Sequence, residues 1–187
     1  MTIALEGSIQ KEIRRWSKEV LEIPSPHFNG VPPCPYAQKA WAEDKVAILF
    51  KHEENYQSLY SCISQFDDKF ELAILADLSN DKPSEAFHEY LNDLNDFIAT
   101  GAFIDKDIWL MGFHPDDEPN EFVEEASFEV ETDTPYAMIF IQRLSKLHEA
   151  SEKLEKTDYY KEYEKQHGLR DMLKVRETYY RRLKDEQ

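Results

Sequence analysis

Four compact apolar runs constrain the fold of this chain more than any other feature. They are VAILF at 46–50, LAILA at 72–76, IWLMGF at 108–113 and AMIFI at 137–141. Each run is continuously apolar instead of alternating with polar residues, a pattern typical of strands that are covered on both faces. The runs therefore predict four strands of one buried sheet.

The segments between the first three runs carry apolar residues at helical spacing. One predicted helix presents Tyr56, Leu59, Tyr60, Ile63 and Phe66, and the next presents Phe87, Leu91, Leu94 and Ile98. We expect Ser84 to cap the second helix and Gly101 to end it. The alternation of strand and helix predicts right-handed crossovers and a mainly parallel three-stranded sheet. The fourth strand follows a long loop, so its direction stays open.

The predicted fold class is α/β, with a single domain at residues 1–143 and a C-terminal helical extension at 144–187. The domain holds a mainly parallel or mixed four-stranded sheet flanked by helices. Another helix is predicted at 8–22, before a proline-rich irregular loop, and a short one near 35–44. The extension has a stripe of Leu169, Leu173, Tyr180 and Leu183. We expect this stripe to pack on the domain or on a partner, for example in a homodimer through these helices.

The net charge of the chain limits the classes of partner that it can bind. The formal net charge is −16, and such an acidic surface repels phosphate backbones and anionic lipids, so neither nucleic acid nor a membrane is expected as a partner. No apolar stretch reaches the roughly 20 residues of a transmembrane helix, and the N-terminus lacks the order of a signal peptide, so we expect a cytoplasmic protein. No phosphate-binding loop or dinucleotide fingerprint occurs, and no nucleotide cofactor is expected.

The first candidate site follows the third run, where His114 and Asp116 stand at the end of the expected strand. Ligands of parallel α/β sheets collect outside the carboxyl ends of strands. Histidine and carboxylate are ligands that divalent iron or zinc accepts. The alternative is that the acidic loop is only solvated and that His114 is structural.

The second candidate lies in the proline-rich loop, which carries His27 and Cys34. If this loop closes over the strand ends, these two residues can join His114 and Asp116 as metal ligands, or Cys34 can act as a catalytic thiolate. The alternative is that Cys34 is a small buried apolar residue. The other cysteine, Cys62, belongs to the apolar face of a helix, so Cys34 is expected to be the functional and faster-reacting thiol.

Two further candidates flank the fourth run. Tyr136 precedes it and is a candidate catalytic residue, and Arg143 follows it. An arginine can bind the carboxylate or phosphate of a substrate with two parallel hydrogen bonds. The alternative for Arg143 is a structural salt bridge with the acidic residues of the chain.

Several short motifs occur together in a defined order: Trp16, Cys34-Pro35-Tyr36-Ala37, His114-Pro115, and Pro135-Tyr136 followed by a strand and Arg143. This order resembles the bacterial domain-of-unknown-function family fourteen-fifteen, over roughly residues 10 to 185. The segment that holds His27 is extra relative to that pattern, and Thr134 and Ala137 replace the family's usual residues. The resemblance implies a similar length and motif order. It implies no activity, because none is established for that family.

The sequence thus supports two functional hypotheses. The first is a small metal-dependent enzyme of small-molecule metabolism, with Cys34 and His114 at the centre of its site and iron or zinc as the metal. Redox chemistry is preferred to hydrolysis, because no general base stands out. The second is a non-catalytic binding or accessory protein that acts through its C-terminal helices.

Overall fold

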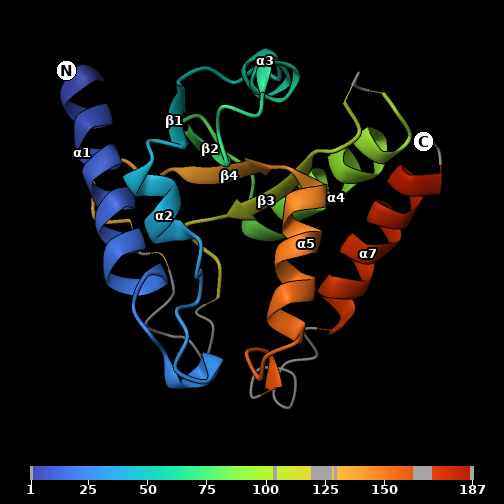
Figure 1. Cartoon of the computed structure of the whole chain (residues 1–187). Helices are drawn as coiled ribbons and strands as arrows, with labels where there is room; N and C mark the ends of the chain where they lie inside the picture. Colours follow the sequence, from blue (N-terminus) through green and yellow to red (C-terminus); the bar gives the residue numbers. More distant parts are fainter. Residues whose placement is uncertain (1, 103–104, 119–127, 129, 162–169, 186–187) are drawn as a thin grey trace.

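A single mixed sheet organises the computed structural model, which describes residues 2–102, 105–118, 128, 130–161 and 170–185 (Figure 1). Its strands are β1 (Val46–Lys51), β2 (Leu72–Asp77), β3 (Trp109–Phe113) and β4 (Ala137–Gln142). They lie side by side in the order β1-β2-β4-β3. All four apolar runs therefore form strands, and the predicted α/β fold with a four-stranded sheet is confirmed.

The order of the strands corrects the expectation of three adjacent parallel strands. β1 and β2 are parallel, whereas β4 is antiparallel to both of its neighbours and separates β2 from β3. Burial follows this order. β2 and β4 are buried along almost their whole length, whereas no residue of β1 is fully buried, as expected for two central strands and an edge strand.

Helices cover both faces of this sheet. Helices α3 (Gln57–Gln65) and α4 (Ser84–Ala99) lie on one face, and α1 (Thr2–Trp16) lies on the other (Figure 1). Neighbouring residues of β2 separate accordingly, because side chains alternate along a strand. Leu75 packs with α3 and α4, while Ile74 packs with Ile13 and Trp16 of α1.

The first helix begins earlier than the sequence predicted. α1 starts at Thr2 and continues into a π-helical turn, η1 (Ser17–Leu21), before the proline-rich loop with its 3-10 turn η2 (Pro26–Phe28). The short helix expected near 35–44 is α2 (Ala37–Ala42). The indole Nε1 of Trp41 in α2 donates a hydrogen bond of 2.8 Å to Ser17 Oγ, which joins α2 to the π-helical turn.

The ends of α4 confirm one prediction and correct another. Gly101 follows the helix with a φ of +85°, a left-handed conformation that glycine adopts without strain. Ser84, in contrast, is the first helical residue and not the cap, which is Pro83. The Ser84 hydroxyl instead donates a hydrogen bond of 2.6 Å to Asp117, in the loop that follows β3.

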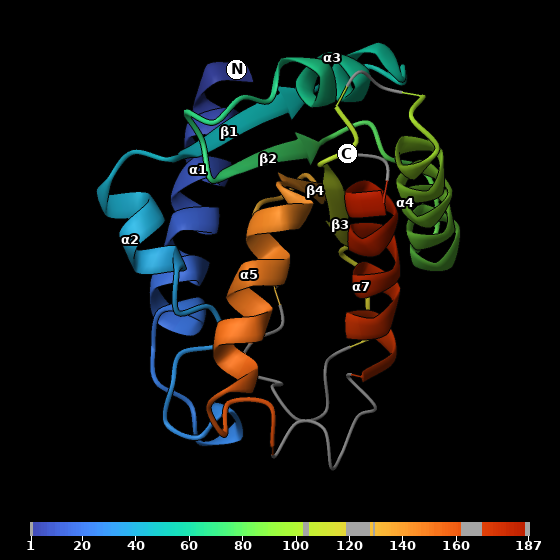
Figure 2. The ribbon, with the colours of Figure 1, turned by 45° about the vertical axis from the view of Figure 1, so that its right-hand side comes forward.

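The C-terminal extension packs on the α/β domain of the same chain. Helices α5 (Leu144–Glu155) and α7 (Arg170–Asp185) lie side by side (Figure 2), and α7 also contacts α4. Tyr180 of α7 stacks on His148 of α5 with 3.9 Å between ring centres, and Tyr179 packs against Trp109 of β3. Leu169 of the predicted stripe lies outside the described residues. None of the described helices is long and apolar enough to cross a membrane.

Candidate functional site

A cleft opens at the edge of the sheet where β1, β2 and β3 end and β4 begins, here called the carboxyl edge. It has a volume of about 110 Å³ and lies between α3 and α4. Its charged lining comes from Lys51, Glu54, Asp77, Asp81 and Lys82, and its apolar lining includes Leu59, Phe87 and Ile139. The cleft therefore combines charged groups of both signs with an apolar wall.

An ion pair between Lys51 and Asp77 forms one side of this cleft. These residues end β1 and β2 and are partners in the parallel register, so their side chains point to the same face of the sheet. The ammonium of Lys51 lies 2.7 Å from Asp77 Oδ2, and the two side chains are only 12% and 7% exposed. The other oxygen of Asp77 accepts hydrogen bonds from the amide and the hydroxyl of Ser79. Asp77 therefore fixes both Lys51 and the turn after β2.

Tyrosine side chains form the opposite wall. The rings of Tyr56 and Tyr90 lie 5.8 Å apart, and the ammonium of Lys82 lies 5.9 Å from the centre of the Tyr90 ring. The Tyr90 hydroxyl is buried, and none of the described residues completes a hydrogen bond with it. Burial, together with the neighbouring Tyr60, Tyr56 and Asp77, raises the pKa of Tyr90 well above its ordinary value. The phenol therefore stays protonated and is available as a hydrogen-bond donor.

His114 lies directly behind the cleft, where it holds the loop that follows β2. Its side chain is 4% exposed. Its Nδ1 accepts a hydrogen bond of 3.1 Å from the amide of Asp116, so its Nε2 carries the proton and donates to the backbone oxygen of Lys82 at 2.9 Å. Asn80 also lines the cleft, and its side-chain nitrogen Nδ2 lies 3.0 Å from the same Nε2. Both ring nitrogens of His114 are thus used by contacts within the chain.

Asp117 joins the loop after β3 to helix α4. Its Oδ1 accepts from the Ser84 hydroxyl at 2.6 Å and lies 2.8 Å from His88 Nε2, and its Oδ2 accepts from the backbone amide of His114 at 2.7 Å. Burial alone would raise the pKa of Asp117. The hydrogen bonds from Ser84, His114 and His88 outweigh this effect, and the pKa is lowered. The carboxylate is therefore held in its charged form.

The proline-rich loop is attached to a different part of the molecule. Cys34 donates its backbone amide to Leu21 at the end of η1, and the Tyr159 hydroxyl, beyond α5, donates to the backbone oxygen of Pro33. Burial raises the pKa of the Cys34 thiol, which disfavours the thiolate that a nucleophile or a metal ligand needs. His27 is exposed on η2.

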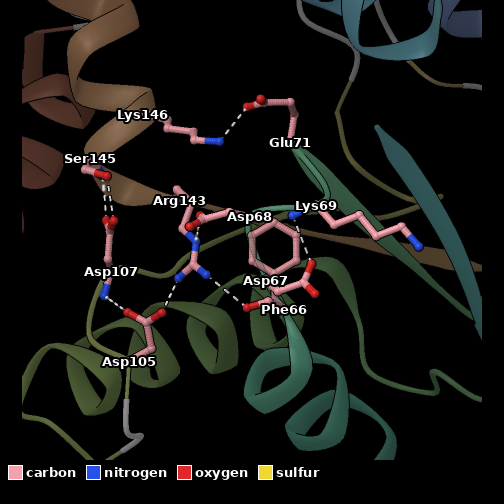
Figure 3. A network of polar contacts seen from close by, with 10 residues as sticks. All are labelled: Phe66, Asp67, Asp68, Lys69, Glu71, Asp105, Asp107, Arg143, Ser145 and Lys146. Atoms are coloured by element: carbon pink, nitrogen blue, oxygen red, sulfur yellow. Dashed lines mark hydrogen bonds and ion pairs between the residues drawn. The ribbon is translucent and has the colours of Figure 1, made fainter. Parts of the chain in front are cut away.

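Tyr136 and Arg143 stand at opposite ends of β4. Tyr136 is buried against α1, on the face of the sheet opposite the cleft, and burial and the nearby Glu12 raise its pKa. Arg143 is bound within the chain (Figure 3). It pairs with Asp105, lies 3.4 Å from Asp68, and donates to the backbone oxygen of Phe66 at 3.0 Å. This arrangement corresponds to the structural salt bridge that the sequence left open.

Of the four predicted metal ligands, His27, Cys34, His114 and Asp116, the structure brings only the last two together. His114 and Asp116 are neighbours, with 3.9 Å between Nδ1 and Oδ2, although the Asp116 side chain is 81% exposed. Within the described ranges, no group of three or more His, Cys, Asp or Glu side chains is arranged to hold a metal ion. His27 and Cys34 therefore do not complete a three-ligand set with His114 in this arrangement.

The sequence analysis did not identify the cleft residues Lys51, Asp77 and Tyr90 as candidate site residues. A signal for the first two was present, since each is the polar residue that directly follows an apolar run. Tyr90 carries no comparable signal, because a tyrosine on an amphipathic helix most often belongs to the core.

Comparisons of the chain with protein-family models, with curated proteins and with solved structures find no match. The resemblance to family fourteen-fifteen stays a prediction.

Proposed function

We propose that this protein binds a small polar metabolite in the cleft between α3 and α4. The observation that carries this proposal is the ion pair of Lys51 and Asp77, which lies almost buried at the carboxyl edge. This is the edge at which α/β sheets bind their ligands, just beyond the ends of parallel strands.

The energetics of burial favour a functional reason for this pair. Removing two charges from water costs several kcal/mol per ion, and the attraction between them often only balances this penalty. Replacement of a buried ion pair by apolar residues of similar size is often neutral or stabilising, so the attraction between Lys51 and Asp77 adds little net stability to the sheet. A buried pair beside an open cleft is instead suited to recognition, because its charges have few waters to displace when a ligand enters.

The surrounding contacts support a preformed site. His114 and Asn80 hold the loop after β2, and Asp117 ties the loop after β3 to α4. Side chains that are fixed before a ligand arrives lose less freedom on binding, which strengthens the affinity.

Nuclear magnetic resonance with a set of small fragments tests this proposal. The set contains carboxylates, amines and zwitterions that fit a cleft of about 110 Å³. We expect at least one class to shift the amide signals of Lys51, Asp77, Ser79 and Asn80. Fragments that shift only signals elsewhere, or none at all, would contradict the proposal.

A double variant provides the matched control. In Lys51→Met with Asp77→Asn both charges are lost, while the new asparagine side chain keeps an oxygen for the amide of Ser79. We expect this variant to stay folded by circular dichroism and to lose the shifts at the cleft. Equal binding to the variant and the natural chain would exclude the ion pair from the site.

The metal-dependent enzyme predicted from Cys34 and His114 stays a prediction, and so does the accessory protein that acts through its C-terminal helices. Elemental analysis of protein purified without a chelating tag tests the first. Stoichiometric iron or zinc that is lost in a folded His114→Gln variant would support a metal site at His114. Pull-down of a stoichiometric protein partner that requires α7 would support the second.

A further inference from the structure

The inner end of the cleft is a place for an anionic group. Among the described contacts, Lys51 uses one of its three ammonium N–H groups on Asp77, so others remain to donate. The buried Tyr90 hydroxyl is a second donor without an acceptor among the described residues, and its raised pKa keeps it protonated. Lys51 and Tyr90 both line this one cleft. A carboxylate there would accept from both donors.

The rim of the cleft is a place for a cationic group. Glu54 and Asp81 line it, and both are exposed. Tyr56, which also lines the cleft, is 56% exposed, and an aromatic face attracts a cation. The strong negative charge of the whole chain acts in the same direction.

The balance of charges excludes simpler ligands. The cleft is lined by two ammonium groups, from Lys51 and Lys82, and by the three carboxylates of Glu54, Asp77 and Asp81. A purely anionic ligand would face the excess of carboxylates. A purely cationic ligand would leave the donors of Lys51 and Tyr90 without a partner, and leaving buried donors unpaired disfavours binding.

The size of the cleft limits the ligand. One water-sized group, such as a methylene or an oxygen atom, needs about 10–15 Å³ of cleft volume. The cleft volume of about 110 Å³ therefore accommodates about 7–11 such groups. Between the two charged ends, the lining of Leu59, Phe87 and Ile139 is apolar. The middle of the ligand is therefore apolar and compact.

From this arrangement we infer that the ligand is an ω-amino acid, a zwitterion whose carboxylate and ammonium lie at opposite ends of a short apolar chain. Its carboxylate contacts Lys51 and Tyr90, its ammonium contacts Glu54 and Asp81, and the apolar chain between them packs on Leu59 and Ile139. This inference rests on the proposed function, because it names the class of ligand for the same cleft.

Binding of 4-aminobutanoic, 5-aminopentanoic and 6-aminohexanoic acid, each compared with the acid that lacks its amino group and with its amide, tests the inference. The first derivative lacks the ammonium, and the second lacks the carboxylate. We expect at least one amino acid to bind with shifts at the amides of Lys51, Asp77, Ser79 and Asn80, and both of its derivatives to bind about 10-fold more weakly or worse, since each loses a charge-assisted hydrogen bond. Derivatives that bind the cleft as well as the amino acid would overturn the inference and leave the proposed cleft intact. If neither these compounds nor the fragment set shifts the cleft signals, both proposals are wrong.

Variants assign the two ends of the ligand. Tyr90→Phe keeps the ring and removes only the donor, so we expect about 2- to 12-fold weaker binding of the amino acid. Tyr179→Phe on α7 is the matched control and should bind normally. Glu54→Gln with Asp81→Asn should weaken binding of the amino acid but not of the acid that lacks its amino group. Equal loss for both compounds would show that the rim carboxylates do not recognise the ammonium.

Discussion

The Nε2 atom of His114 lies 2.9 Å from the backbone oxygen of Lys82, so the residue that directly follows β3 holds the loop that follows β2. Because β4 separates these two strands, this hydrogen bond joins segments that are not neighbours in the sheet. His114 therefore acts on the cleft through the position of Asn80 and Lys82.

Replacement of His114 by alanine should loosen this loop. The backbone oxygen of Lys82 then keeps only the hydrogen bond of 3.2 Å from Asn80 Nδ2, and the loss of the bond from His114 costs about 0.5–1.5 kcal/mol. We expect the free energy of unfolding to fall by this amount and the amide of Asn80 to exchange faster with deuterated solvent. The control His27→Ala, at an exposed position, should change stability by less than about 0.5 kcal/mol. Unchanged exchange at Asn80 in His114→Ala would contradict the role of His114.

Gly112 allows α4 to approach β3 closely. A Cβ atom at this position would lie 2.5 Å from both Phe87 Cε1 and Leu91 Cδ1, which is far inside van der Waals contact. We expect Gly112→Ala to destabilise the protein by about 1–3 kcal/mol, because the side chains of α4 must shift. Urea unfolding measures this difference.

A second glycine gives the control for that experiment. Gly7 lies within α1, and a Cβ atom there meets nothing within 4 Å. Gly7→Ala should stabilise the protein by about 0.5–1 kcal/mol, because alanine favours a helix more than glycine does. A loss of stability in both variants would show that the close approach at Gly112 is not the cause.

The sequence predicted the strands well because their signal is local. Each run contains enough consecutive apolar residues to define a strand by itself, and each observed strand differs from its predicted range by one residue. The position of β4 could not be predicted in the same way. The position of a strand in the sheet depends on which neighbours it pairs with. This pairing is a competition between segments that lie far apart in the chain.

The candidate site was harder to predict, because a side chain's role depends on what reaches it. His114 was identified as the residue of interest at the carboxyl edge, and it does stand there. Its two nitrogens are used by Asp116 and by Lys82, the latter 32 residues away in the chain. Arg143 likewise meets Asp105 and Phe66 only after folding. No local pattern contains these partners.

Both cysteine thiols should react slowly in the folded protein. Burial raises the pKa of Cys34 and of Cys62 above the ordinary value of a thiol, so little thiolate is present at neutral pH. We expect alkylation at pH 7.5 to be much slower than in urea, and its rate at Cys34 to rise about tenfold per pH unit toward pH 9. The variants Cys34→Ser and Cys62→Ser separate the two rates and test the prediction that Cys34 reacts faster. Rapid labelling of Cys34 at pH 6 would instead indicate an activated thiolate.

Asp117 should make the stability of the protein sensitive to acid. Its pKa is lowered in the folded state, because the bonds from Ser84, His114 and His88 outweigh burial, which acts the other way. An acid whose pKa is lower in the folded than in the unfolded state stabilises the fold above its unfolded pKa, about 3.9 for aspartate. That stabilisation is lost as the pH falls through the folded value. We therefore expect the difference in free energy of unfolding between the natural chain and Asp117→Asn to be constant above about pH 5 and to shrink below about pH 4.

Urea unfolding from pH 7 to pH 2.5 measures this difference. Asp116→Asn is the matched control, because its side chain is 81% exposed and stands next to Asp117 in the chain. This control should follow the natural chain at every pH. If the difference for Asp117→Asn is the same at pH 3 as at pH 6, the charge of Asp117 does not hold the loop after β3 to α4. Its hydrogen bonds to Ser84 and His88 would then act equally well from an uncharged side chain.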